Sequence, residues 1–115
     1  MDLIKVFNFI NGEFQDTQNN QSSSYFESFN PATKQVNALI PNSTETDVEM
    51  AVEAALVAFE SWSRKTPSYR SKILLRISNL IQERLEEFAL AESIDQGKPL
   101  SLARSVDIPR AIYNF

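Results

Sequence analysis

Few side chains in this sequence could carry out acid–base or nucleophilic chemistry. It contains no histidine and no cysteine, so thiol nucleophiles, thiolate metal sites, disulfides and imidazole bases are excluded. Carboxylates, lysines, tyrosines and serines remain, and they form no recognisable catalytic constellation. Tyr69 and Lys72 are spaced to share one face of a predicted helix, where a surface packing pair is the simpler explanation.

Phosphate-binding and dinucleotide-binding motifs are also missing. The two glycines of the chain, Gly12 and Gly97, cannot supply a three-glycine dinucleotide fingerprint or a nucleophile elbow. Gly97-Lys98 resembles the end of a phosphate-binding loop. However, Pro99 stands where a Ser or Thr would hold magnesium, and no glycine lies at the required position upstream. We therefore expect neither phosphate nor nucleotide binding by this chain.

Charge and hydropathy argue against nucleic acid and membrane as partners. The formal net charge is −4, so the summed field repels phosphate backbones and anionic lipid. A basic segment at 64–76 follows an acidic helix and has Tyr69 as its one aromatic residue, so internal charge complementarity explains it better. No apolar run has the length of a membrane span, and polar residues interrupt the first fourteen positions before a signal-peptide core forms. We expect a cytoplasmic protein.

The first strands of the chain are predicted to form a hairpin. Residues 3–10 are rich in β-formers and end at Asn11-Gly12, a dipeptide that suits a two-residue hairpin turn. That turn would set Phe9 opposite Phe14 as a cross-strand aromatic pair.

A polar loop and a second strand pair are expected next. Residues 15–24 are all polar, with five Gln or Asn among them, which predicts an exposed, mobile loop. Short strands are predicted at 25–29 and 36–40. They are separated by the turn signal Asn30-Pro31-Ala32-Thr33.

The remainder of the chain, 43–115, predicts helices. Thr44 and Asp47 have the spacing of a capping box with a shorter acid. An apolar stripe then recurs at helical spacing, formed by Val48, Ala51, Val52, Ala55, Phe59 and Trp62. The acids on the opposite face are explained as a solvated helix surface that complements the helix dipole: Glu45, Asp47, Glu49 and Glu53.

A second helical region begins at Thr66-Pro67, with Thr as N-cap and Pro in the first turn. It continues towards Gly97 as one long helix, or as two broken near Arg84. A last helix is expected to begin near Ser105 or Asp107.

A chain of 115 residues has the size of one structural unit. Amphipathic helices with so little sheet lack an obvious partner for their apolar stripes, so we expect poor stability in isolation.

Four sequence blocks stand in a fixed order between about residue 9 and residue 115. The blocks are Phe9 to Phe14, Phe29 to Thr33, the helical positions between Asp47 and Glu86, and Asp95-Gln96-Gly97-Lys98-Pro99. In their order and spacing they resemble the NAD(P)-dependent aldehyde dehydrogenase family. One departure is Lys34, where the family usually has glycine, so this turn needs either another conformation or a strained lysine.

The resemblance implies an α/β fold and a place within it. The N-terminal β-hairpin and short strands (1–42) and the helices (43–115) would add to a Rossmann-like sheet built by later sequence, as a truncated coenzyme domain that is mostly helical in isolation. It also implies that the cofactor-binding elements, the general-base glutamate and the cysteine nucleophile lie beyond the aligned region. No residue of 1–115 is therefore assigned a catalytic or cofactor-binding role.

A narrower resemblance concerns the end of the chain. The residues from Asp95 to Arg104, with Asp107-Ile108-Pro109-Arg110 and Asn114-Phe115, look like the branch that oxidises 2-aminomuconic or 2-hydroxymuconic semialdehydes. These substrates carry a carboxylate, and the last helix corresponds to one that lines the family's substrate tunnel. Arg110 could then bind the carboxylate as a bidentate ion pair. An ordinary surface arginine is the competing explanation, and Arg104 is the weaker alternative.

Family members often hold a monovalent cation, which the resemblance would place at Asp95 with backbone oxygens near Ser28 and Phe29. Asp95 as an acceptor that stabilises its own loop is the simpler explanation.

Our leading hypothesis is an incomplete, non-catalytic dehydrogenase, either a truncated or pseudogene product or part of a longer sequence, with no cofactor of its own. Full-length relatives would oxidise a semialdehyde to an acid with NAD. The alternative is a binding module that associates with complete aldehyde dehydrogenase subunits through its exposed apolar faces. A small helical scaffold without a metabolic role is a third possibility, which the ordered blocks disfavour.

Overall fold

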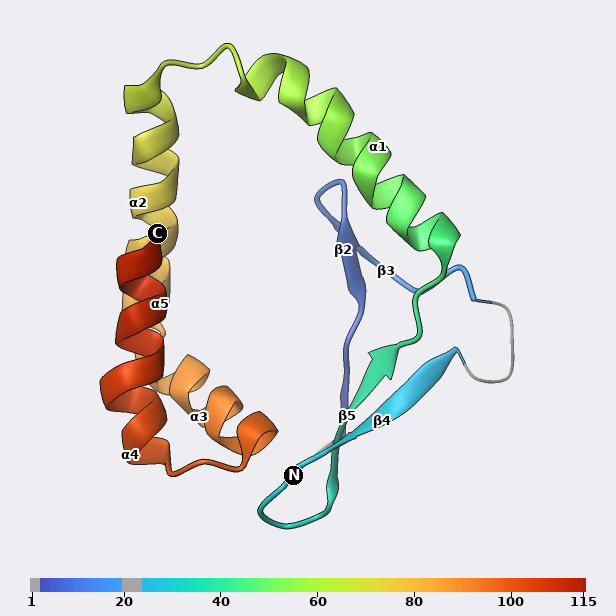
Figure 1. The fold of residues 1–115 in the computed structure, drawn as a ribbon, viewed down its shortest axis with the longest axis vertical. Helices are drawn as coiled ribbons and strands as arrows, with labels where there is room; N and C mark the ends of the chain where they lie inside the picture. The colour runs from blue at the N-terminus through green and yellow to red at the C-terminus, as the bar shows by residue number, and fades with distance from the viewer. Residues whose placement is uncertain (1–2, 20–23) are drawn as a thin grey trace. The chain divides into compact units, whose positions relative to one another are not determined.

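The computed structural model describes residues 3–19 and 24–115, and these form two compact units. The first unit contains the described residues up to 29 together with 36–64. The second contains 30–35 together with 65–115. The length of the chain suggested one unit. Two are found because the first long helix packs with the strands, whereas the later helices pack among themselves (Figure 1).

The predicted hairpin is confirmed. Strand β2 (Asn8–Ile10) pairs antiparallel with β3 (Glu13–Gln15), and Phe9 lies opposite Phe14 with 4.9 Å between the ring centroids. Asn11 and Gly12 in the turn have φ values of 54° and 81°. Positive φ at both central residues is what a type I′ hairpin turn requires.

A separate three-stranded sheet has the order β1-β5-β4. In it β5 (Val36–Pro41) runs parallel to β1 (Ile4–Lys5) and antiparallel to β4 (Tyr25–Phe29). The two strands predicted at 25–29 and 36–40 are therefore confirmed. The β-forming run at 3–10 is divided between the two sheets, because the Val6 amide still donates to the Leu39 carbonyl whereas Asn8 already pairs with β3.

The turn between β4 and β5 contains the strained lysine. Lys34 has a φ of 61°, in the left-handed region that a side chain with a Cβ disfavours. Its amide donates to the Asn30 carbonyl at 2.8 Å, and the Asn30 amide donates to the Gln35 carbonyl at 2.9 Å. The turn thus keeps a conformation suited to glycine, held by these hydrogen bonds.

The prediction of an exposed loop at 15–24 is wrong at its beginning. Gln15 belongs to β3, and Thr17 is buried. The Thr17 hydroxyl donates to the Asp47 carboxylate at 2.7 Å, so this buried polar side chain has its hydrogen bond satisfied. Residues 20–23 lie outside the described residues.

Helix α1 (Glu45–Trp62) begins with the predicted capping box. The Thr44 amide donates to the Asp47 carboxylate at 2.7 Å, and the Thr44 hydroxyl accepts from the Asp47 amide at 3.5 Å. Much of its predicted apolar stripe lies on the surface of the unit, since Val48, Val52 and Phe59 are each more than half exposed. Leu56 and Val57, which lie outside the predicted stripe, are also more than half exposed.

The second unit begins with α2 (Pro67–Glu83) and α3 (Leu85–Gln96). Thr66 caps α2 by accepting from the Tyr69 amide at 3.2 Å. The helices are separated at Arg84, which has a φ of −107°, so the prediction of two helices broken there is confirmed. Helix α3 ends at Gly97, with a φ of 67°. A Cβ at this position would lie 3.0 Å from the Ala32 nitrogen and from Pro31. Glycine is therefore needed both for its positive φ and because there is no room for a Cβ.

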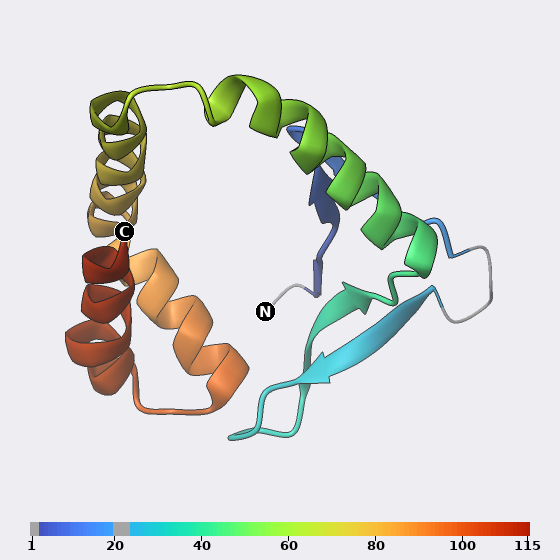
Figure 2. The same cartoon turned by 45° about the horizontal axis from the view of Figure 1, so that its top comes forward.

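The last helical region begins earlier than predicted. Instead of starting near Ser105 or Asp107, it starts with α4 (Leu100–Leu102), continues through a π-helical turn, η1 (Ala103–Asp107), and ends with α5 (Ile108–Asn114). Pro109 does lie in the first turn of α5. In both views α5 lies beside α2 (Figures 1 and 2), and the Ser78 hydroxyl donates to the Ile112 carbonyl at 2.9 Å.

The packing of the second unit explains the π-helical turn. Ala89, Ala103 and Ile108 form the buried cluster, against which Ile81, Leu85, Leu100 and Ile112 pack. Residues five apart in a regular α-helix point about 140° away from each other. Here the Ile108 amide donates to the Ala103 carbonyl. This wider turn brings both side chains to the same core.

Candidate functional site

Arg110 lies on the outward side of α5. It follows the buried Ile108 by two positions, which corresponds to about 200° around a helix, so its side chain is exposed. Within 3–19 and 24–115 it forms no hydrogen bond or ion pair. Its five N–H donors are therefore available to a planar anion such as a carboxylate.

Arg104, the weaker alternative, already has a carboxylate partner. Its Nε and Nη2 donate to the two oxygens of Glu86 on α3, each at 2.7 Å. These hydrogen bonds hold the pKa of Glu86 below its usual range. Arg104 thus joins η1 to α3, and of the two arginines Arg110 is the better candidate for binding a ligand.

Asp47 occupies a different position from the one predicted. It was expected on the solvated face of its helix, but only 4% of it is exposed. Its carboxylate accepts from the Thr17 hydroxyl at 2.7 Å and the Gln18 amide at 2.9 Å, besides both donors of Thr44. The capping carboxylate therefore also anchors the segment after β3 to the start of α1.

These contacts set the charge state of Asp47. Burial is the largest single influence on the Asp47 pKa and raises it. The hydrogen bonds from Thr17, Thr44 and Gln18 together outweigh burial, so the pKa lies well below its usual range. A depressed folded-state pKa stabilises the fold above the unfolded value of about 4. That stabilisation is lost as the pH falls below this value towards the folded pKa.

We predict that Asp47→Ala destabilises the first unit by about 2–4 kcal/mol, because it removes the helix cap and leaves the Thr17, Gln18 and Thr44 donors without their acceptor. Urea denaturation followed by far-UV circular dichroism should show a lower midpoint of helix loss. The difference from the unsubstituted chain should shrink as the pH falls from about 5 to 2, because the unfolded wild-type chain then binds a proton at Asp47 that the folded chain does not.

Glu49→Ala is the matched control, since Glu49 is an exposed acid on the same helix. It should change the free energy of unfolding by less than about 0.5 kcal/mol. Equal effects of the two substitutions would show that Asp47 acts only as a surface charge.

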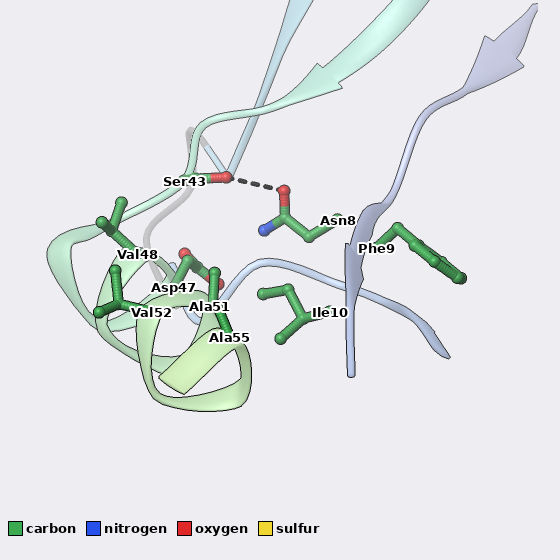
Figure 3. A pocket seen from close by; sticks show the side chains of 9 residues that line it. All are labelled: Asn8, Phe9, Ile10, Ser43, Asp47, Val48, Ala51, Val52 and Ala55. Carbon is green, nitrogen blue, oxygen red and sulfur yellow. Dashed lines mark hydrogen bonds between the residues drawn. The ribbon is translucent and has the colours of Figure 1, made fainter. Parts of the chain in front are cut away.

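A cavity of about 420 Å³ lies between β2 and the start of α1 (Figure 3). Ile10 points towards Ala51 and Ala55 of α1, and Val48 and Val52 extend the apolar wall. Asn8 accepts a hydrogen bond from the Ser43 hydroxyl at 3.0 Å, and its buried amide nitrogen has no partner. No pair of acid and base groups lines this cavity, so its walls suit apolar packing and one hydrogen-bond acceptor rather than catalysis.

The residues predicted for a monovalent cation are distributed over both units. Asp95 is exposed, and its carboxylate accepts from the Gln96 side chain at 2.8 Å. Ser28 and Phe29 end β4 in the first unit. In the described part of the chain, no group of three or more acidic residues is placed to hold a metal ion. The cation site therefore stays a prediction.

The sequence contains no apolar run with the length of a membrane span, and the helices agree with this. In residues 3–19 and 24–115, no helix is both long and apolar enough to cross a bilayer.

Comparison with known proteins identifies the family. The model of the aldehyde dehydrogenase family matches residues 17–115. The chain belongs to the aldehyde dehydrogenase family. Its hairpin, short strands and helices are those of an aldehyde dehydrogenase, as solved structures show. The NAD+ complex of the Bacillus cereus aldehyde dehydrogenase superposes with a TM-score of 0.85 at 38% identity, over 98% of this chain and 22% of that one.

Curated aldehyde dehydrogenases confirm the narrower resemblance. The 2-aminomuconic semialdehyde dehydrogenase of Bos taurus is 47% identical over 98% of this chain and 22% of its own length. The 2-hydroxymuconic semialdehyde dehydrogenase of Pseudomonas is 39% identical over 96% of this chain and 22% of its own length. The chain thus spans about a fifth of the length of the curated relatives that it matches.

Two features of the site escaped the sequence reasoning. The second role of Asp47 depends on Thr17, thirty residues earlier, and its only local signal was an Asp where a capping box usually has Glu. The pairing of Lys98 with acids on both sides of the Gly97 turn was also missed. Its signal was the charged pattern Glu92, Lys98 and Asp107 around a helix stop.

Proposed function

We propose that this chain is the N-terminal part of the coenzyme domain of an aldehyde dehydrogenase, and that it is not catalytic by itself. In the complete subunit, which would oxidise a semialdehyde with NAD, the chain would help to bind a substrate that also carries a carboxylate. The observation that carries the proposal is Arg110, an exposed guanidinium without a partner among 3–19 and 24–115, within the sequence block that resembles the muconic semialdehyde enzymes. A cytoplasmic location is part of the same proposal.

The chain's own residues do not fit a coenzyme site. Gly12 lies in a hairpin turn, and the space beside Gly97 is filled by Pro31 and Ala32. Neither glycine leaves backbone open to a pyrophosphate at the start of a helix, which is what dinucleotide binding requires. We therefore propose no NAD-binding residue in 1–115. The proposed role of the chain is to complete the fold and to contribute to the choice of substrate.

A graft tests the proposal. This chain replaces the matched segment of the Bos taurus enzyme, and the graft is assayed by NADH formation with 2-hydroxymuconic semialdehyde and with a neutral aldehyde of similar length. We expect the graft to be active and to have the higher kcat/KM for the acidic substrate, because Arg110 pairs with its carboxylate. A folded but inactive graft, or one that favours the neutral aldehyde, would contradict the proposal.

The second candidate function is a module that binds complete aldehyde dehydrogenase subunits. The exposed apolar face of α1 favours it, because four large apolar side chains on one side of a helix are unusual on a free surface: Val48, Val52, Leu56 and Phe59. An inactive graft together with a stable complex between the free chain and an intact subunit, seen by size-exclusion chromatography, would favour this function over the first.

A further inference from the structure

Lys98 joins two carboxylates that belong to different helical segments. Its Nζ lies 2.8 Å from Glu92 Oε1 on α3 and 2.8 Å from Asp107 Oδ2, at the end of η1. The lysine side chain is 25% exposed, and the two acids are 33% and 32% exposed. Solvent therefore screens these pairs less than ordinary surface pairs. The Ser93 hydroxyl also donates to the Lys98 carbonyl at 2.7 Å, which fixes the lysine backbone.

The cluster of Lys98, Glu92 and Asp107 holds the end of the π-helical turn. Arg104 ties the beginning of η1 to α3 through Glu86, and Lys98 ties its last residue, Asp107, to α3 through Glu92. π-helical turns are rare and usually extend over a single turn, so these ties add to the packing of Ala103 and Ile108 in keeping it. Because α5 follows directly, Asp107 contributes to the rotation of α5 about its axis, together with the packing of Ile108 and Ile112.

Arg110 lies one turn beyond Asp107, and the direction of its side chain depends on that rotation. If η1 relaxed into an α-helical turn, the residues after it would rotate by about 100° relative to those before it. Arg110 would then face a different direction. Without Lys98, Glu92 and Asp107 would both lose the cation that they share and would repel each other, which favours such a change.

We propose that Lys98 is a positioning residue for Arg110 and thereby contributes to the selection of carboxylate-bearing aldehydes. The inference rests on the proposed function, since it requires Arg110 to contact the substrate. Lys98 itself contacts neither substrate nor coenzyme in this scheme. It acts through Asp107 and the orientation of α5.

The test measures the selectivity ratio of the graft, defined as kcat/KM for 2-hydroxymuconic semialdehyde divided by kcat/KM for the neutral aldehyde. We expect Lys98→Met to lower this ratio by about ten- to hundredfold, mainly through the KM of the acidic substrate, because a displaced guanidinium loses its bidentate geometry. Lys98→Arg should restore most of the ratio, since Arg can also bridge two carboxylates. Lys72→Met, at an exposed lysine on α2, is the control and should leave the ratio unchanged.

A double substitution separates positioning from general stability. In the Arg110→Ala background, Lys98→Met should lower the ratio no further, because its effect passes through Arg110. If Lys98→Met does not fold, Asp107→Asn removes the same tie with a smaller change and should give the same selective loss. Equal losses on both substrates, or a further loss in the Arg110→Ala background, would overturn the inference.

The two proposals fail in different ways. If Arg110→Ala leaves the ratio unchanged, the proposed substrate contact is wrong, and the role of Lys98 falls with it. If Arg110→Ala lowers the ratio but neither Lys98→Met nor Asp107→Asn does, the proposed function stands and only the positioning role is overturned.

Discussion

The purified chain is expected to form no NADH above the blank with any aldehyde. Covalent catalysis in aldehyde dehydrogenases uses a cysteine thiolate, and this chain has no cysteine. No arrangement of its lysines, tyrosines and acids replaces that nucleophile in the described residues. The effect is therefore the loss of the whole enzymatic rate enhancement, on the order of a millionfold or more.

The measurement compares the free chain and the graft at equal molar concentration, under NAD saturation. The chain should be prepared from a host whose own dehydrogenases have been removed, and heat-treated protein provides the blank. Turnover by the free chain that follows its concentration and survives this purification would contradict the prediction. Activity of the graft in the same assay shows that the substrate and coenzyme were competent.

Arg110→Ala in the graft should reduce kcat/KM for the acidic semialdehyde by a large factor. A charge-assisted pair at a desolvated site contributes about 2–5 kcal/mol, which corresponds to roughly thirtyfold to several thousandfold. Oxidation of a neutral aldehyde of similar size should change little, because the nucleophile, the general base and the coenzyme site lie outside the substituted helix. The loss is thus expected to be selective for the substrate carboxylate.

Arg76→Ala is the matched control for that substitution, because Arg76 is an exposed arginine on α2 of the same unit. It should leave both rates within about twofold of the unsubstituted graft. Equal losses on both substrates after Arg110→Ala would assign Arg110 a structural role. No loss on either would make it an ordinary surface residue.

Local signals allowed much of the fold to be predicted. The hairpin followed from Asn11-Gly12, whose backbone tolerates the positive φ values that the turn needs. The start of α1 followed from Thr44 and Asp47. Each of these elements depends on residues no more than three positions apart, and so a short stretch of sequence contains the full physical cause.

The missed features depend on contacts between distant residues. Asp47 was expected in solvent because its helix face is acidic, but Thr17 and Gln18 pack over it from thirty positions away. The last helix was expected to begin near Ser105 or Asp107, because Pro109 suits a first helical turn, but Ala103 and Ile108 are both buried although they do not have α-helical spacing. Their common burial against Ala89 selects a π-helical turn, and no propensity of single residues indicates it. At the candidate site, the sequence was enough to select Arg110, whereas the fold was needed to show that no other described residue pairs with it.

The uncovered face of α1 has a consequence for the life of the chain in a cell. Val48, Val52 and Phe59 are exposed on a helix that is complete by Trp62, so the ribosome presents an apolar surface before the rest of the proposed subunit could cover it. Such surfaces are recognised by chaperones and associate with one another at micromolar concentrations. During translation of this segment, chaperone binding therefore competes with aggregation, and a chain whose α1 face stays uncovered becomes a substrate for proteolysis.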